Sequence, residues 1–369
     1  MVAIPYHEGR FPPSIQWERL VPLLGPTAAS LARFDGMLSA MPNADVLLAP
    51  LVTREAVLSS RIEGTRATIG DVLEFEAGNE IASATLRDDI DEVLNYRRAI
   101  REAERRLETL PMSQRLVRGV HAVLLAGVRG RSASPGEYRR VPNGIGAPGS
   151  TLADARYVPI SPERVPDAMS AWERFVHSDY PDQLVQIAVL HAEFEAIHPF
   201  IDGNGRLGRM LIPLLLWQVG VIQRPVFYVS AYFERRREQY YDRLLGVSRD
   251  DDWTGWCHFF LEGLRTQAED NQAKASGILN LSGELKLRIP EITRSQYAMR
   301  AVDWIFANPV FNSTAFVNSS NVPEPTARRF LSLLQAEAVL TVLRPGRGRQ
   351  AAILGFPALI RVVDGEASA

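Results

Sequence analysis

The residues best suited to chemistry in this sequence form one run, from His198 to Arg209. The run reads His-Pro-Phe-Ile-Asp-Gly-Asn-Gly-Arg-Leu-Gly-Arg and precedes a strongly apolar stretch. Its glycines let a backbone approach a ligand closely, and they open a predicted helix whose unpaired N–H groups favour an anion. Arg206 and Arg209 lie three residues apart on that helix, so both guanidinium groups can reach bound phosphates. The run therefore predicts a binding site for a polyphosphate.

The same run offers a metal ligand and a proton acceptor. Asp202 stands just before the glycines, where phosphates would repel its carboxylate unless a divalent cation lay between them, and Mg²⁺ is the obvious cation. His198, with an ordinary pKa of about 6.5, is suited to take a proton from an incoming hydroxyl. Each feature alone is common in structural loops, so the prediction depends on their conjunction. The chain contains neither a Walker-type P-loop nor a kinase catalytic loop.

The run matches, position for position, the signature His-Pro-Phe-x-[Asp/Glu]-Gly-Asn-Gly-Arg-x-x-Arg. By this match the chain resembles the Fic family. The resemblance implies a mainly helical core and an enzyme that binds ATP together with Mg²⁺. It also implies transfer of AMP to a Ser, Thr or Tyr hydroxyl of a protein target, the chain itself included, with release of diphosphate. Relatives lead us to expect a homodimer as well.

The resemblance assigns a role to each position of the run. His198 would be the general base, Phe200 an anchor in the core, and Asp202 the Mg²⁺ ligand. The glycines and the asparagine between them would cradle the α- and β-phosphates, and the two arginines would bind the β- and γ-phosphates. The positions expected to bind ATP are Asp202, Gly203, Asn204, Gly205, Arg206, Leu207, Gly208 and Arg209.

Two further segments resemble parts of the family's nucleotide site. Residues 136–146 look like the flap, a hairpin that holds the target's side chain against the α-phosphate by strand addition. The flap residues expected to contact ATP are Asn143, Gly144, Ile145 and Gly146. Tyr240 and Tyr241 resemble the pair that lines the adenine pocket, where their rings could stack on a base. Relatives often have Asn about eight residues further on, whereas this chain has Ser248, so the details of adenine recognition stay open.

Ser59, Glu63 and Gly64 fit the family's inhibitory pattern [Ser/Thr]-x-x-x-Glu-[Gly/Asn]. Apolar residues at three- and four-residue intervals predict a helix over 50–63 that ends at this glycine. A carboxylate in its last turn faces the negative end of the helix dipole, which costs roughly 0.3–1 kcal/mol, so another group should hold it. The resemblance implies that this group is Arg209, which would then not grip the γ-phosphate. We therefore expect an autoinhibited enzyme.

The elements that must position these residues are mainly α-helices. Hydrophobic periodicity predicts helices over 50–63, 71–76, 89–107, 113–125, 166–177 and 182–198. Between Gly136 and Pro159 the pattern changes to Gly, Pro and β-prone pieces, with 138–141 and 156–160 as the arms of a small β-hairpin. The apolar stretch Leu211–Val219 reads as a buried core helix. The fold class is thus a Fic helical core with a hairpin flap, an N-terminal helical extension and a C-terminal winged helix-turn-helix.

The predicted domains are an N-terminal arm with the inhibitory helix over 1–65, the Fic core over 66–270, and the C-terminal module over 283–369, with a linker at Asn271–Ser282. In the module, helices over 295–306, 313–319 and 325–337 precede strands over 340–343 and 351–354, which is typical of a winged helix. Five arginines could meet phosphates on its predicted recognition helix and wing: Arg328, Arg329, Arg344, Arg347 and Arg349. Such a module binds DNA in some proteins and serves dimerisation or substrate docking in others, and the sequence leaves both open.

Other functions stay open at this stage. The chain could be a nucleotide-responsive DNA-binding regulator with the Fic core as a sensor, although a pure sensor would not need His198. Members of the family with the same signature can use another donor, transferring UMP or phosphocholine or acting as kinases. Glu63 could also orient a water that removes AMP from modified targets.

Composition sets further limits. The formal net charge of the 369 residues is -2, so no overall field would draw the chain to nucleic acid or to an anionic membrane. One cysteine, Cys257, excludes an intrachain disulfide and fits a reducing compartment, so we expect a cytoplasmic protein. Met1–Pro13 does not resemble a signal peptide, and no apolar run approaches the roughly 20 residues of a membrane span, so no membrane partner is expected.

Overall fold

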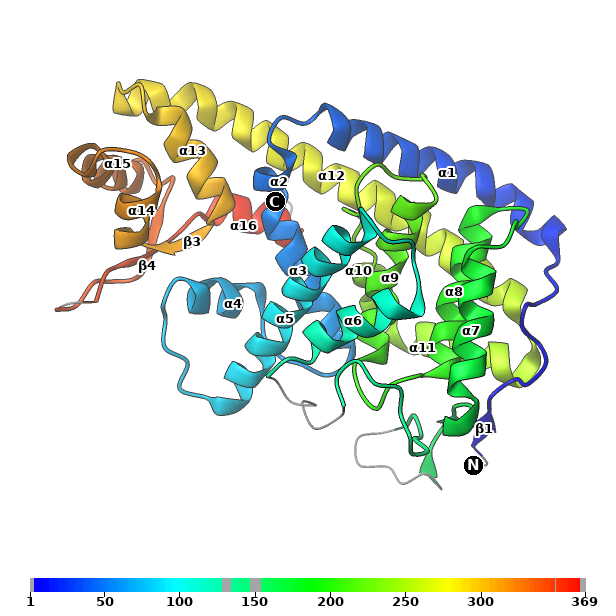
Figure 1. The fold of residues 1–369 in the computed structure, drawn as a ribbon. Coiled ribbons are helices and arrows are strands. Elements are labelled where there is room, and N and C mark those ends of the chain that lie inside the picture. Colours follow the sequence, from blue (N-terminus) through cyan, green and yellow to red (C-terminus); the bar gives the residue numbers. More distant parts are fainter. Residues whose placement is uncertain (1–2, 128–133, 147–153, 349, 366–369) are drawn as a thin grey trace. The chain divides into compact units, whose positions relative to one another are not determined.

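The computed structural model describes residues 3–127, 134–146, 154–348 and 350–365. Helices dominate these residues, as the sequence predicts, and the strands are short (Figure 1). None of the described helices has the length and apolar character needed to cross a bilayer. The chain divides into two compact units, each made of several segments.

The first unit comprises the described residues of Met1–Asp35, Leu58–Thr65 and Leu94–Glu269. It holds β1 (Ile4–Pro5), α6 (Gln114–Leu124), β2 (Tyr157–Val158), a 3₁₀ turn (Pro162–Arg164), α7 (Val165–Val176), α8 (Gln183–Ile197), α9 (Asn204–Gln218), α10 (Ser230–Arg235) and α11 (Arg237–Asp250). Four helices have residues in both units: α1 (Trp17–Ala40), α3 (Ala49–Ile62), α5 (Ala84–Leu107) and α12 (Trp253–Thr293). The helices predicted from periodicity are confirmed, with ends that differ by a few residues.

Helices α8 and α9 form the centre of this unit and pack against each other, while α7 covers the other side of α8 (Figure 1). Asp182 caps α8 by accepting hydrogen bonds from the backbone N–H groups of Leu184 and Val185, at 2.9 and 3.0 Å. Nearly every side chain of α8 is buried, and α9 is the buried helix that the apolar stretch Leu211–Val219 predicts. Two buried helices joined by a short connection hold the intervening loop, residues 198–203, at a fixed place.

The predicted hairpin is present but narrower than expected. Ile145 and Tyr157 form an antiparallel bridge, with backbone N–H···O distances of 2.9 and 3.0 Å. The predicted arm over 138–141 is not a strand, because the Arg139 backbone N–H bonds instead to the Pro199 carbonyl at 2.9 Å. Strand β2 pairs in parallel with β1 from the N-terminal arm. Residues 147–153, part of the Gly-rich middle of the hairpin, lie outside the described residues.

The second unit comprises the described residues of Gly36–Val57, Arg66–Val93 and Asp270–Ala369. It holds α2 (Ala44–Leu47), α4 (Ile69–Glu76), α13 (Ala298–Ala307), β3 (Val310–Asn312), α14 (Ser313–Ser319), α15 (Glu324–Ala336), β4 (Thr341–Arg344), β5 (Ile353–Gly355) and α16 (Pro357–Asp364). The three strands form one antiparallel sheet in the order β3-β5-β4. The predicted helices and the β4–β5 hairpin are confirmed, whereas the assignment as a winged helix stays a prediction.

The expected linker at Asn271–Ser282 is wrong, because these residues lie inside α12. Ala275 and Ile278 are fully buried there, and a solvated linker would leave such side chains exposed. Of the arginines expected to contact DNA, Arg328 pairs with Glu324 of its own helix at 2.8 Å and Arg344 donates to Asn79 Oδ1 at 2.8 Å. Arg349 lies outside the described residues, and DNA binding stays a prediction.

Candidate active site

A cavity of about 540 Å³ lies where α8, α9, α11 and the end of α3 meet in the first unit. Residues from the signature run, the tyrosine pair, the hairpin and the inhibitory segment line it together. From these sets the lining includes His198, Gly205, Arg209, Tyr240, Tyr241, Ile145, Gly146 and Glu63. The volume is within the usual range for small-molecule sites.

His198 ends α8 in the left-handed region, with a φ of +48°. Burial lowers its pKa to about 4, although the Glu63 carboxylate and the Glu195 carbonyl act in the opposite direction. The imidazole is therefore neutral at neutral pH and able to accept a proton. The side chain of Arg139 donates to the backbone carbonyl of His198 at 2.9 Å, which fixes the position of the histidine backbone.

The loop between α8 and α9 is braced from inside. The Asn204 side chain accepts from the Phe200 N–H and donates to the Phe200 carbonyl, both at 2.9 Å. Gly203 adopts a φ of +79° at the start of α9, a conformation that favours glycine. The α9 N-terminus thus presents its first N–H groups beside the cavity, while the Asn204 side chain itself holds the loop closed.

Asp202 is the candidate magnesium ligand. Its side chain is 47% exposed, with Oδ1 at 2.6 Å from the Gly203 N–H and 3.5 Å from Arg206 NH2. One half-exposed carboxylate fits Mg²⁺, which keeps several waters and completes its shell with phosphate oxygens rather than with a full protein cage. No cluster of three or more acidic, His or Cys side chains suited to a metal occurs among the described residues.

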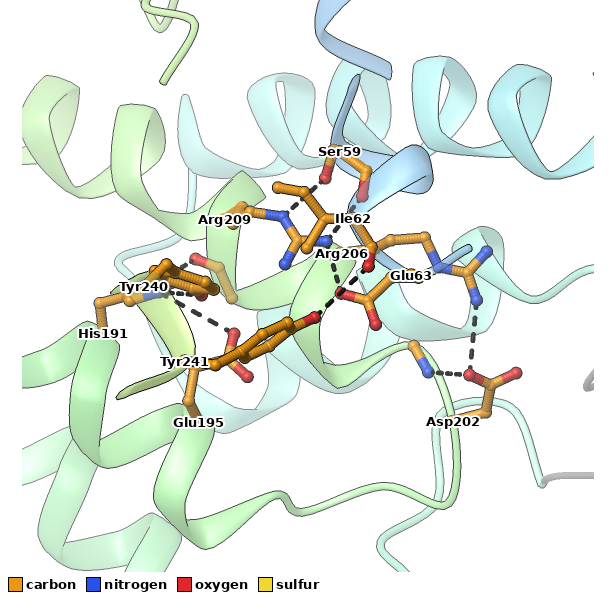
Figure 2. Close-up of polar contacts among 12 residues, drawn as sticks. Ser59, Ile62, Glu63, His191, Glu195, Asp202, Arg206, Arg209, Tyr240 and Tyr241 are labelled. Atoms are coloured by element: carbon orange, nitrogen blue, oxygen red, sulfur yellow. Dashed lines mark hydrogen bonds and ion pairs between the residues drawn. The ribbon is translucent and has the colours of Figure 1, made fainter. Parts of the chain in front are cut away.

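Arg209 is almost fully buried, with 1% of its side chain exposed, and its contacts come from the end of α3 (Figure 2). Its Nε donates to Ser59 Oγ at 3.0 Å, and NH2 donates to the Ser59 carbonyl at 2.8 Å and to Glu63 Oε1 at 2.7 Å. Burial raises the pKa of Glu63, but Arg209 outweighs it, and the pKa lies below its ordinary value. Gly64, with a φ of +107°, turns the chain away just after this contact.

The tyrosine pair lies on α11 beside this contact. Tyr240 is buried and its hydroxyl is 2.9 Å from His191 Nε2, whereas the Tyr241 hydroxyl donates to the Ile62 carbonyl at 3.4 Å (Figure 2). The two rings lie 5.4 Å apart. Ser248 does not line the cavity, because its hydroxyl lies 2.8 Å from His7 Nδ1 of the N-terminal arm.

Other expected positions lie farther from the cavity. Asn143 donates to the Phe200 carbonyl at 3.3 Å, and Gly144 is exposed on the hairpin. Leu207 is buried in the core, and the Gly208 carbonyl lies 3.1 Å from His191 Nδ1. Asp202, Gly203, Asn204 and Arg206 are also not among the residues that line the cavity. The ATP contacts expected at all these positions, and at those that do line it, stay predictions.

Sequence reasoning missed Glu195, which lines the cavity between Arg209 and Tyr240. Its Oε1 has no hydrogen-bond partner among the described residues and lies 3.9 Å from His191 Nε2. Burial raises its pKa to about 8, and the attraction of Arg209 only partly offsets that rise. The signal was present, because residues 191, 195 and 198 lie at four- and three-residue spacing on one face of a helix.

Two further residues near the signature run were also missed. The Arg139 side chain donates to four backbone carbonyls, those of Val141, Ile160, Ile197 and His198. His121, on α6, is fully buried and stacks on Phe200 with ring centroids 3.7 Å apart. Burial lowers the pKa of His121 to about 4. An isolated His or Arg in a sequence gives no sign that it supports a loop more than fifty residues away.

Comparison with known proteins agrees with this architecture. The Fic/DOC family N-terminal model matches residues 21–105, and the Fic/DOC family model matches residues 111–216. Together the matches span more than half of the chain, and the chain belongs to the Fic/DOC family.

A Fic family protein from Desulfovibrio desulfuricans has a similar fold, with a TM-score of 0.58 and 20% identity over 90% of this chain and 96% of that one. A Fic domain containing signaling protein from Bacteroides thetaiotaomicron has a TM-score of 0.51 and 18% identity over 71% and 97%. These identities show the fold alone.

Curated relatives match over shorter lengths. A probable protein adenylyltransferase of Aquifex aeolicus is 29% identical over 99 residues, which is 27% of this chain and 31% of that protein. The protein adenylyltransferase Fic of Drosophila yakuba is 27% identical over 130 residues, which is 34% of this chain and 23% of that protein. The chain therefore spans less than a third of the length of these relatives.

Proposed function

We propose that this protein is an adenylyltransferase that moves AMP from ATP to a hydroxyl side chain of a protein and that Glu63 holds it in a weakly active state. The observation that carries the proposal is the cavity that combines neutral His198, the α9 N-terminus, Arg209 and the tyrosine pair. The names of the adenylyltransferases from Aquifex and Drosophila support the same chemistry.

In this proposal the base of ATP lies against Tyr240 and Tyr241, whose faces suit stacking. The phosphates lie toward the α9 N-terminus, where backbone N–H groups and Arg206 offset their charge. Mg²⁺, held by Asp202 when bound, would supply further charge neutralisation. These groups act mainly by orienting the α-phosphorus and stabilising the charge that develops on the leaving diphosphate.

His198 acts on the acceptor. The neutral imidazole takes the proton of the attacking hydroxyl as the new bond from oxygen to the α-phosphorus forms and the bond to the diphosphate oxygen breaks. The buried histidine also keeps its place, since Arg139 holds its carbonyl and the turn at +48° ends α8 at this residue. The products are an AMP-modified side chain and diphosphate.

Glu63 opposes the reaction through Arg209. As long as the guanidinium is bonded to Glu63 and Ser59, its N–H groups on that side are not available to a γ-phosphate, and the negative charge of Glu63 would repel an arriving phosphate. Displacement of Glu63 would remove both obstacles at once.

Two radiolabels test the chemistry. The Glu63→Gly variant is incubated with Mg²⁺ and ATP labelled on either the α- or the γ-phosphate, and protein-bound label is measured. AMP transfer places the α-label on protein and the γ-label in diphosphate. If protein carries the γ-label but not the α-label, the enzyme is a kinase and the proposed AMP transfer is wrong. The same assay with labelled GTP, CTP and UTP identifies the nucleotide donor.

A further inference from the structure

The buried imidazole of His121 joins two segments of the site that are distant in sequence. Its Nδ1 accepts a hydrogen bond from the Gly136 N–H at 2.8 Å, at the root of the hairpin. Its Nε2 lies 2.9 Å from the Asp202 carbonyl, in the loop that follows His198. Since Nδ1 accepts, the proton of the neutral ring is on Nε2, which donates to that carbonyl.

The surroundings allow His121 little freedom. The ring stacks on Phe200 at an interplanar angle of 11°, and α6 holds it with the side chain fully buried. A Cβ at position 203 would lie 3.5 Å from Nε2, and a Cβ at position 136 would meet the Arg118 carbonyl at 3.0 Å. Gly136 also has a φ of +79°, so both its backbone conformation and the close approach to α6 favour glycine there.

The hairpin and the loop face the cavity from two sides. Ile145 and Gly146 of the hairpin line it together with His198. An acceptor side chain that reaches His198 enters a space that the hairpin helps to bound, so we expect the distance between hairpin and loop to affect whether a hydroxyl fits there. A water molecule is smaller than a hydroxyl side chain, so its access to the site depends less on that distance.

We propose that His121 is a positioning residue. Its two hydrogen bonds, to Gly136 and to Asp202, fix the distance between the hairpin and His198 so that a protein hydroxyl, rather than water, reaches the α-phosphorus. The proposal rests on the proposed function for its activity readouts. It predicts that each bond has its own effect: the bond to Gly136 governs use of the acceptor, and the bond to Asp202 governs the nucleotide.

Two conservative variants separate the bonds. In His121→Gln the amide nitrogen can occupy the place of Nε2 and donate to the Asp202 carbonyl, but nothing accepts from the Gly136 N–H. In His121→Asn the amide oxygen can occupy the place of Nδ1 and accept from Gly136, but the side chain is too short for Asp202. If His121 only stabilised the fold, the two variants would differ in stability but would change acceptor use and nucleotide binding in the same way.

Both variants are made in the Glu63→Gly background and incubated with Mg²⁺ and α-labelled ATP, and protein-bound label is compared with free AMP released by water. We expect His121→Gln to lower the ratio of protein label to free AMP about five- to tenfold, the effect of one lost hydrogen bond, with the dissociation constant for Mg²⁺-ATP unchanged. We expect His121→Asn to weaken nucleotide binding by a similar factor and to leave the ratio unchanged. Equal ratios in both variants and the parent would overturn the proposal.

Hydrogen exchange tests the same idea without activity. The Gly136 amide should exchange faster in His121→Gln than in His121→Asn, and unchanged exchange in both variants would also overturn the proposal. If Glu63→Gly itself transfers no label while faster exchange is seen in His121→Gln, the proposed function fails and the hydrogen-bond link between the two segments stands.

Discussion

Glu63 and Arg209 are 146 residues apart in the sequence, and their side chains meet at 2.7 Å. The Arg209 side chain is 1% exposed and the Glu63 side chain is 34% exposed, so the arginine is buried while the glutamate keeps a face toward solvent, and both line the cavity. We expect this pair to persist in the absence of ligand. A polyphosphate in the cavity carries more negative charge than one carboxylate and could displace Glu63 from Arg209.

Glu63→Gly should raise the rate of AMP transfer at least tenfold at saturating Mg²⁺-ATP, because Arg209 is released. Glu63→Asp keeps the charge one methylene shorter and should stay near the wild-type rate. The rate is measured as the α-label transferred to protein. Equal rates for Glu63→Gly and wild type would show that Glu63 does not inhibit the enzyme.

The same substitution should lower stability. A buried guanidinium left without its carboxylate is costly, and since Glu63 is partly exposed we expect a loss of about 1–3 kcal/mol, less than for a fully buried pair. Mg²⁺-ATP should return much of this loss, since a ligand at about a hundred times its dissociation constant stabilises by about 2.7 kcal/mol. Thermal denaturation with and without nucleotide measures both effects, and a Glu63→Gly variant as stable as wild type would contradict the buried ion pair.

Glu195 should make stability depend on pH. Its pKa of about 8 in the folded state lies above the ordinary value of 4.5, so between those values the folded chain holds a proton that the unfolded chain has lost. Stability contributed by this proton therefore falls as pH rises through that window. Glu195→Gln should be more stable than wild type at pH 8 and little changed at pH 5, while Glu108→Gln, at an exposed position, should show no such trend.

Asp202→Asn tests the candidate metal ligand. The amide oxygen can still accept from the Gly203 N–H, so the loop should keep its shape, but the charge that attracts Mg²⁺ is gone. Half-maximal activity should require about tenfold more Mg²⁺, and a chelator should abolish transfer in both proteins. An unchanged Mg²⁺ titration curve would show that Asp202 does not bind the metal.

The N-terminal arm contains one buried and one exposed side-chain pair, so their contributions to stability can be compared. His7 lies 2.8 Å from Glu193 with both side chains buried, whereas the neighbouring Glu8 pairs with Arg164 at the surface. His7→Ala should cost about 2 kcal/mol, because Glu193 keeps only the Tyr6 hydroxyl as a partner in the core, and Glu8→Ala should change stability little. Denaturant titration gives both values, and similar losses in the two variants would mean that the arm does not depend on the buried pair.

Much of this architecture could be predicted from the sequence, because the patterns that indicate it lie among residues close to one another in the chain. The helices follow from apolar spacing, and the signature run carries its glycines, arginines and histidine within twelve residues. The contact between Glu63 and Arg209 was available only through the family resemblance, since no spacing rule relates the two positions.

The rest depends on tertiary contacts. The hairpin arm over 138–141 was expected to be a strand, but Arg139 bonds to the loop at Pro199 and His198 instead. The polar stretch 271–282 was expected to be a linker, but burial of Ala275 and Ile278 keeps it helical. His121 shows no motif of its own and Glu195 shows only its helical spacing with His191 and His198, so their roles arise from what α9 and the hairpin bring against them.

In the proposed function His198 drives AMP transfer and Glu63 restrains it. The most direct measurement compares wild type, Glu63→Gly and the double variant Glu63→Gly/His198→Ala, each with Mg²⁺ and α-labelled ATP, by gel and by intact mass. We predict strong labelling of protein by Glu63→Gly, weak labelling by wild type and none by the double variant, although the double variant still binds ATP. Equal labelling by Glu63→Gly and the double variant, or no labelling by Glu63→Gly while it binds ATP, would contradict the account.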